Sequence, residues 1–272
     1  MRASVNGITM EFEMGGSGTP VLLVHGFPLN RQMWQPQMKA LIAAGYRVIC
    51  PDLRGFGGSE ASGGETGISQ FADDLVGLLD HLQIERAVIG GMSMGGYVLL
   101  DLLERHPSRC SAACFIVTRS GADDDAGKAR RLALAQEADK FGPQVVANAF
   151  AGILFAPGAE DRHPELTAEV YSWMVATSTS GLTGGLLAMR ERKDYTPLVP
   201  MLRIPCLVIG AEQDRAIPPE NSRQLASKIP DCTSCIIPEA GHLANLEQPD
   251  AFNACLLGFL DRLNGKFPGN RS

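Results

Sequence analysis

A serine between glycines is the feature of this sequence whose residue types and spacing point most directly to chemistry. Ser93 follows the apolar run 87–90, stands between Gly91 and Gly95, and is followed by a helix-forming segment. A serine at the tip of a strand–turn–helix has backbone angles that neighbouring side chains would obstruct, so small residues are needed two positions before and after it. The pattern is that of a nucleophile elbow, which exposes the hydroxyl above a sheet and aims N–H groups of the next helix at the same point.

Two further residues could activate such a serine. A serine hydroxyl attacks well only when a base removes its proton, and a neutral imidazole held by a carboxylate serves best. Asp214 follows the apolar run 206–209, and His242 follows the run 233–237. Parallel strands place such loops at the same carboxyl edge of a sheet as the elbow. The order Ser93, Asp214, His242 therefore predicts a catalytic triad of nucleophile, orienting acid and base.

The elements around these residues alternate between strands and helices. An Asn-Gly turn at Asn6 and Gly7 predicts an antiparallel hairpin at the start of the sheet. Buried-strand patterns then lie at 21–24, 46–50, 87–90, 112–117, 206–209 and 233–237, and helical patterns at 33–44, 68–82, 94–104, 220–229 and 248–263. This alternation predicts an α/β fold with a mostly parallel sheet and helices on both faces. The tail 266–272 is expected to be frayed.

The alternation stops between residues 119 and 196. This stretch has helical patterns, such as 126–140 and 143–150, but no strand pattern. An all-helical insertion between two core strands is the simplest interpretation, which gives a core domain of residues 1–118 and 197–272 and a helical lid of residues 119–196. We expect most large apolar side chains of the lid to pack internally and some to overhang the serine as an acyl pocket.

Composition narrows the partners and the location. The chain has 272 residues, 45% of them hydrophobic and 20% charged, with a net charge of −6. Its basic groups at 128–131 and 190–193 are short and interrupted, so we do not expect nucleic acid as a partner. No apolar stretch approaches the ~18 residues that span a bilayer, and residues 1–7 lack an apolar signal core, so we expect a cytoplasmic protein without membrane contact. Monomer and homodimer both stay open.

The cysteines predict neither a disulfide nor a metal. There are seven, an odd number without a secretion signal, which is typical of reduced thiols. Cys232 and Cys235 have the spacing of half a zinc site or of a redox motif. No second such pair or histidine pair follows at ligand spacing, and the segment runs into Ile236 and Ile237, which are typical of a strand. We therefore expect no metal site.

Four separated motifs in this order make the chain resemble the α/β-hydrolase superfamily over nearly its whole length. They are His25-Gly26-Phe27-Pro28, Asp52-x-Arg54-Gly55-x-Gly57-x-Ser59, Gly91-Met92-Ser93-Met94-Gly95-Gly96, and Asp214 with Gly241-His242. The resemblance implies an α/β-hydrolase fold with a mostly parallel eight-stranded sheet. It implies Ser93 as nucleophile, His242 as general base and then acid, and Asp214 as the orienting carboxylate. It also implies that the backbone N–H groups of Phe27 and Met94 form the oxyanion hole and that His25 and Asp52 are structural.

The serine at the elbow limits the chemistry that this resemblance implies. Branches similar to epoxide hydrolases and haloalkane dehalogenases attack through an Asp at this position, so those activities are disfavoured. What remains is attack on an ester, thioester or lactone carbonyl, followed by hydrolysis of an acyl-enzyme, without a metal or organic cofactor. We expect a carboxylic ester hydrolase for small to medium acyl groups, with Met92, Leu29 and Trp173 as substrate-binding residues in an adaptable apolar pocket.

Several alternatives stay open. The segment 93–96 is also similar to that of cofactor-free perhydrolases, once called haloperoxidases, and of enol-lactone hydrolases, which share the triad. A carbon–carbon bond hydrolase has weaker support, because no carboxylate-binding arginine stands at a defined place. A slow hydrolase that serves as a small-molecule receptor or regulatory protein is the alternative of another class. If Asp214 were not the acid, Glu212 or a carboxylate among residues 123–125 would be the candidate.

Overall fold

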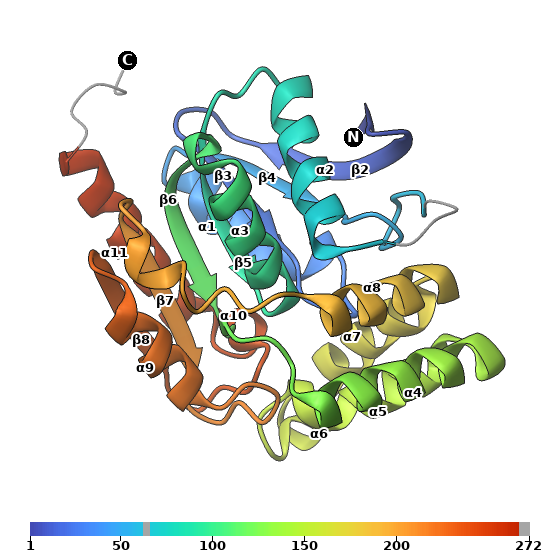
Figure 1. Cartoon of the computed structure of the whole chain (residues 1–272). Coiled ribbons are helices and arrows are strands. Elements are labelled where there is room, and N and C mark those ends of the chain that lie inside the picture. The colour runs from blue at the N-terminus through green and yellow to red at the C-terminus, as the bar shows by residue number, and fades with distance from the viewer. Residues whose placement is uncertain (62–65, 267–272) are drawn as a thin grey trace.

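The computed structural model describes residues 1–61 and 66–266 and contains one eight-stranded sheet (Figure 1). Its strands are β1 (Arg2–Val5), β2 (Ile8–Gly15), β3 (Pro20–Val24), β4 (Arg47–Pro51), β5 (Ala87–Met92), β6 (Cys110–Ile116), β7 (Cys206–Ala211) and β8 (Cys232–Ile237). Their order across the sheet is β1-β2-β4-β3-β5-β6-β7-β8. β2 pairs antiparallel with β1 and β4, and all other pairs are parallel. The predicted mostly parallel sheet is confirmed, whereas residues 267–272 of the tail lie outside the described part.

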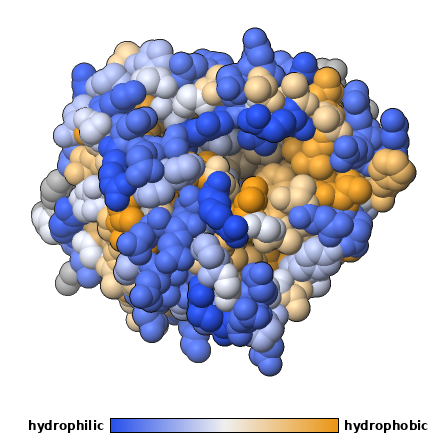
Figure 2. Space-filling view, turned by 90° about the horizontal axis from the view of Figure 1, so that it is seen from below, coloured by the Kyte–Doolittle hydropathy of each residue, from blue (hydrophilic) through white to orange (hydrophobic). Residues whose placement is uncertain are grey.

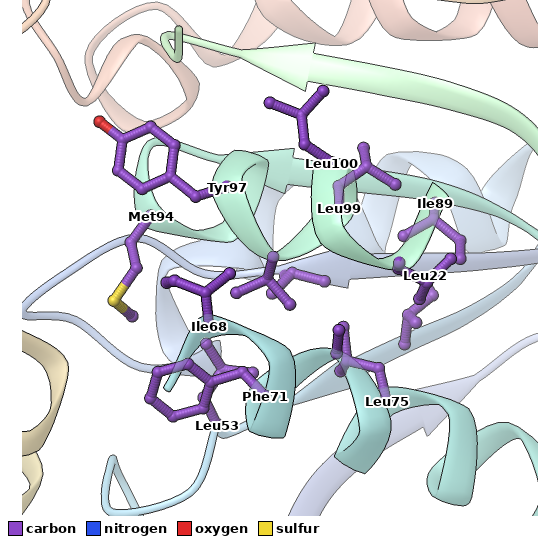
Figure 3. Close-up of a cluster of buried hydrophobic side chains, with 14 of the residues drawn as sticks. Leu22, Leu53, Ile68, Phe71, Leu75, Ile89, Met94, Tyr97, Leu99 and Leu100 are labelled. Carbon is purple, nitrogen blue, oxygen red and sulfur yellow. The ribbon is translucent and has the colours of Figure 1, made fainter. Parts of the chain in front are cut away.

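Helices cover both faces of the sheet. One face packs against α1 (Gln35–Ala43) and α11 (Pro249–Lys266), and the other against α2 (Ile68–His81), α3 (Met94–Arg105) and α9 (Pro219–Lys228). Alternate residues of β3 show why this strand is apolar throughout, since Val21 and Leu23 belong to one apolar cluster and Leu22 to the other. Figure 3 shows part of the cluster between the sheet and helices α2 and α3.

The short elements complete the core. They are the 3-10 helices η1 (Arg31–Trp34), η2 (Pro107–Arg109) and η3 (Val199–Met201) and the one-turn helix α10 (Ala244–Glu247). The single helix expected at 33–44 is thus a 3-10 turn that runs into α1, with Pro36 near the start of the α-helix. Proline is favoured there because its missing N–H would have no partner in any case.

Residues 119–196 form helices only, and all of them are described. These are α4 (Asp125–Phe141), α5 (Pro143–Leu154), α6 (Ala159–Arg162), α7 (Pro164–Ala176) and α8 (Thr179–Glu191), which lie together at one end of the sheet (Figure 1). Local signals set the ends of α4. At its start, the Asp124 side chain accepts a hydrogen bond of 2.7 Å from the Gly127 N–H, and at its end Gly142 has a φ of 83°. The division into a core domain and a lid at 119 and 196 stays a prediction.

An arginine cluster ties the start of this stretch to its end. The Asp123 carboxylate receives hydrogen bonds from Arg131 at 2.5 Å, from the buried Arg192 at 2.8 Å and from Arg119. Burial works against its ionisation, but the bonds from Arg192 and Arg131 outweigh it and hold the pKa of Asp123 well below its usual range. Asp123 is therefore a structural anion that joins the two ends of residues 119–196.

The expectation of reduced thiols throughout is wrong. Cys235 of β8 and Cys255 of α11 form a disulfide, whereas Cys50, Cys110, Cys114, Cys206 and Cys232 are free. Cys232 and Cys235 are three residues apart on one strand, so their side chains point to opposite faces of the sheet, and Cys235 alone faces α11. Their spacing therefore cannot make a two-thiol site. Within residues 1–61 and 66–266 no cluster of His, Cys, Asp or Glu has the make-up of a metal site. None of the described helices is long and apolar enough to cross a membrane.

Candidate active site

Ser93 occupies a sharp turn between β5 and α3. Its φ of 52° and ψ of −111° lie outside the conformations that side-chain-bearing residues favour. Two bonds hold the turn, since the Ser93 N–H donates to the Ile116 carbonyl at 2.9 Å and the Thr118 hydroxyl donates to the Ser93 carbonyl at 2.8 Å. Ser93 is the one residue between 87 and 103, all of which are described, that is not buried. The turn thus presents a single hydroxyl at the surface of a fully buried segment.

The glycines around Ser93 are required by close packing. A Cβ on Gly91 would lie 2.2 Å from the Gly95 carbonyl oxygen, and a Cβ on Gly95 would lie 2.5 Å from the Val24 carbonyl oxygen. Gly26, in the loop after β3, also lies beside the turn but with more room, because its Cβ would stand 3.3 Å from the Met92 carbonyl oxygen and 3.4 Å from the Ser93 Cβ. The turn can therefore form only where the backbone of β3 passes directly beside it. This contact brings the 26–27 segment to the serine.

Asp214 and His242 lie together at the carboxyl ends of β7 and β8. His242 Nδ1 donates to Asp214 Oδ2 at 2.7 Å, and both side chains are almost fully buried. The other carboxylate oxygen, Oδ1, accepts the N–H groups of Ala216 at 2.8 Å and Ile217 at 2.9 Å. With Nδ1 protonated and directed at Asp214, Nε2 is the nitrogen left to act as a base. The order of residues thus predicted the pair, and the structure brings it together.

The predicted oxyanion donors belong to two segments that lie beside Ser93. Phe27 directly follows Gly26, and Met94 is the first residue of α3. Within the described part of the chain, neither backbone N–H has a hydrogen-bond acceptor. The Met94 side chain turns away into the apolar cluster (Figure 3), so its backbone is the part available to a ligand. N–H groups at a helix start are suited to a developing negative charge.

His25 and Asp52 connect the loops that carry these donors. The Leu53 N–H donates to His25 Nε2 at 2.9 Å, so Nδ1 carries the proton and donates to the Gly26 carbonyl at 2.9 Å. Burial lowers the pKa of His25, which keeps this histidine neutral. Asp52 accepts the N–H groups of Arg31 and Gly58, both at 2.8 Å. Both side chains thus bond the backbone of the loops around them, and a purely structural role for them stays a prediction.

The predicted substrate-binding residues are packed more tightly than expected. Met92, Leu29 and Trp173 all belong to the apolar cluster on the α11 face, and they expose 1%, 1% and 8% of their surface. Trp173 also borders a cavity of about 270 Å³ beside Arg31 and Thr177, at the seam between α7 and the loop before η1. A substrate role for these three residues stays a prediction.

Phe150 of α5 links the helices of residues 119–196 to the loop that carries Phe27. Its ring makes an edge contact with the Phe27 ring, with 5.2 Å between centroids, and Phe27 makes another with Phe56 at 5.9 Å. Phe150 is half-buried and packs against both apolar clusters. Figure 2, which looks from below Figure 1 toward these helices, shows a hollow with hydrophobic surface along one side and hydrophilic surface along the other. A pocket of mixed character is what an ester with an apolar acyl group requires.

Two residues of this region escaped the sequence analysis. Thr118 holds the turn through the Ser93 carbonyl, and Glu247 accepts the N–H group of Gly241, which directly precedes His242, at 2.9 Å. Nothing in the spacing marks Thr118. Glu247 carried one signal, which is a carboxylate among the apolar residues Leu243, Ala244 and Leu246.

Comparisons with known proteins agree with the fold. A family model described as the alpha/beta hydrolase fold matches residues 19–249. The chain is 32% identical over 251 residues to 3-oxoadipate enol-lactonase 2 of Acinetobacter baylyi, which covers 92% of each chain. It is similar to the structure of a thermophilic esterase from Thermogutta terrifontis, with a TM-score of 0.93, 35% identity and coverage of 96% and 98% of the two chains. It is also similar to the enol-lactonase from Burkholderia xenovorans LB400, with a TM-score of 0.89, 30% identity and coverage of 96% and 100%.

Proposed function

This chain belongs to the α/β-hydrolase family, and we propose that it is a serine hydrolase that cleaves carboxylic esters of small to medium acyl groups. The observation that carries the proposal is the buried bond of 2.7 Å between His242 Nδ1 and Asp214 Oδ2, in the two loops that follow β7 and β8. It leaves an imidazole Nε2 at the edge of the sheet where the Ser93 turn also lies. A nucleophile, a base and an orienting acid of this order are the parts of acyl transfer.

The proposed reaction has two halves. His242 Nε2 takes the Ser93 proton as Oγ attacks the carbonyl carbon, and the N–H groups of Phe27 and Met94 stabilise the oxyanion that forms. Collapse breaks the bond to the leaving oxygen, which takes the proton from His242 and departs as the alcohol. A water then attacks the acyl-enzyme, gives its proton to His242 and releases the acid, and Ser93 Oγ recovers that proton. Asp214 stabilises the imidazolium in both halves.

Hydrolysis of an enol-lactone is the second candidate. The similarity to the two enol-lactonases, at 32% and 30% identity, favours it. The steps are the same, except that the leaving enol stays attached to the acyl group until water releases the ring-opened acid. The half-buried Phe150, beside Phe27, would suit a compact ring as well as a short acyl chain. We further propose that residues 119–196 act as a lid over this pocket.

Steady-state hydrolysis of p-nitrophenyl esters from acetate to decanoate, next to a series of simple lactones, tests these candidates. We expect sustained turnover with an optimum at short to medium chains, and its loss by about 10⁶-fold in Ser93→Ala, as for removal of the serine of a comparable triad. A single burst of product release without further turnover would instead favour the receptor alternative. Turnover that survives in Ser93→Ala would refute the nucleophile assignment.

A further inference from the structure

Glu247 lies where the His242 loop meets the lid. It is the last residue of α10, five positions after His242, and only 7% of its surface is exposed. Its Oε1 accepts the N–H of Gly241 at 2.9 Å, and its Oε2 accepts the N–H of Ala156 at 2.9 Å. One carboxylate therefore bonds the backbone just before the predicted base and the backbone between α5 and α6.

The two backbone segments also touch each other directly. A Cβ on Gly241 would lie 2.2 Å from the Ala156 nitrogen, so only glycine allows this approach. On the other side of His242, the Leu243 N–H donates to the Leu154 carbonyl at 3.0 Å. The chain is thus pinned to residues 154–156 both before and after His242. The Arg215 side chain adds a bond of 3.2 Å to the Phe155 carbonyl, next to Asp214.

We propose that ionised Glu247 is a positioning residue, which holds the His242 loop and residues 154–156 of the lid as one unit so that His242 stays aligned with Ser93. This inference rests on the proposed function. Glu247 touches neither the triad side chains nor the predicted oxyanion donors, so it acts through the backbone of Gly241. Its role is to fix the place of the base, where a displacement of 1 Å can cost about 100-fold in rate.

The charge of Glu247 is what the geometry requires. Two N–H donors on two different oxygens need a carboxylate, because a protonated acid presents an O–H to one of them and loses that bond. Burial raises the pKa of Glu247, and the two N–H bonds together with the charges of Arg162 and His163, which face it from the lid, pull the pKa back. As pH falls through this raised pKa, Glu247 gains a proton and loses one of its two N–H bonds, which loosens the link between loop and lid.

The protonation of Glu247 should therefore appear in the pH profile of the rate, as a second protonation that lowers activity on the acid side. His242 must be neutral to act as a base, and Glu247 must be charged to hold it in place. Both forms are lost as pH falls, so the logarithm of kcat/KM should steepen from a slope of about 1 toward about 2 against pH in the range where Glu247 gains its proton. A residue that merely stabilised the fold would leave the slope at about 1.

The test compares Glu247→Gln with Glu239→Gln. The control makes the same change in the same loop, at an exposed glutamate whose side chain has no partner among the described residues. We expect Glu247→Gln to lower kcat by up to about 100-fold with little change in KM and to show an acid limb of slope about 1, whereas Glu239→Gln keeps the wild-type rate and slope. Glu247→Asp keeps the charge and should recover part of the loss in kcat and the steeper slope.

Labelling by a fluorophosphonate separates the possible failures. If the wild-type serine is not labelled, the proposed function has failed. If it is labelled, and Glu247→Gln is labelled and turns over as fast, only the present inference is overturned. Should Glu247→Gln fail to fold, the wild-type profile decides, because an acid limb of slope about 1 contradicts a second titrating group.

Discussion

Ser93 and His242 are held in place by different kinds of interaction. The Ser93 turn is set by the backbone. Its glycines let strands β3 and β5 and helix α3 approach one another, and Ser93 itself has an unfavourable φ of 52°. His242 sits in a loop after an edge strand, where the backbone contacts of Gly241 and Leu243 are joined by side-chain bonds. Asp214 bonds its ring, and Glu247 bonds the preceding residue.

We call the turn at Ser93 with its neighbouring strands the serine half of the site, and the loops that carry Asp214 and His242 the histidine half. The two halves should respond differently to substitutions. The serine half lies between buried strands β3 and β6, so errors there strain the core and should be felt in the free energy of unfolding. The histidine half depends on hydrogen-bond chemistry at single carboxylates, so errors there should be felt in the rate. Variants at single residues in each segment separate these two effects.

Asp214→Asn should have the largest effect on the histidine half. Because Oδ1 accepts two N–H groups, the amide oxygen of the asparagine would take its place and the amide nitrogen would face His242 Nδ1. That nitrogen donates, so it would force the proton of His242 onto Nε2, where it blocks proton transfer from Ser93. We expect kcat to fall by roughly 10⁴-fold with an unchanged melting temperature, measured by ester hydrolysis and calorimetry.

Asp194→Asn provides a matched control for that variant. Asp194 Oδ1 accepts the Thr196 N–H at 2.8 Å, which is the same turn that Asp214 makes with Ala216, but it has no histidine partner. Its activity should equal that of the wild type. If Asp214→Asn were as active as Asp194→Asn, another acid would serve, and Glu212 would be the first to test because Asp123 is engaged by arginines.

The two halves also differ in how far the sequence revealed them. Periodicity predicts the strands and helices because each buried face must be apolar. The turn at Ser93 is recognised in the sequence because its two glycines lie within two residues of the serine. Asp214 and His242 were found through their order and their place after strands. Glu247 and the bond between Cys235 and Cys255 were missed, because both join segments that meet only when α10 packs against residues 154–156 and α11 packs against β8.

The disulfide supports the histidine half from outside the site. Cys255→Ser removes a link across 20 residues between β8 and α11, and we expect the free energy of unfolding to fall by about 3 kcal/mol while kcat stays unchanged. Urea denaturation with and without a reductant measures this. The variant and the reduced wild type should be equally stable. If Cys255→Ser and the wild type were equally stable without the reductant, the two thiols of the wild type would be reduced, as the sequence suggested.

Gly95→Ala tests whether the serine half is set by backbone contact. Its Cβ would lie 2.5 Å from the Val24 oxygen and 2.8 Å from the His25 oxygen, so β3 or the turn must move, at a cost of about 1–3 kcal/mol in unfolding free energy. Gly152→Ala is the control, because its Cβ in helix α5 meets nothing within 4 Å and alanine favours a helix by up to about 1 kcal/mol. Equal stability of the two variants would contradict the close packing.

Ser93→Gly should show the smallest and most specific effect. Both Ser93→Gly and Ser93→Ala lose the hydroxyl, so they differ only in the Cβ that the positive φ disfavours. Relief of that strain, about 1–3 kcal/mol, exceeds the larger chain entropy that glycine loses on folding, so Ser93→Gly should be more stable than Ser93→Ala by about 1 kcal/mol. At Ser227, in the helix α9, the order should reverse, because glycine weakens a helix relative to alanine. If the alanine variant were the more stable one at both positions, the turn would store no strain at Ser93, and the close packing of its glycines alone would determine its shape.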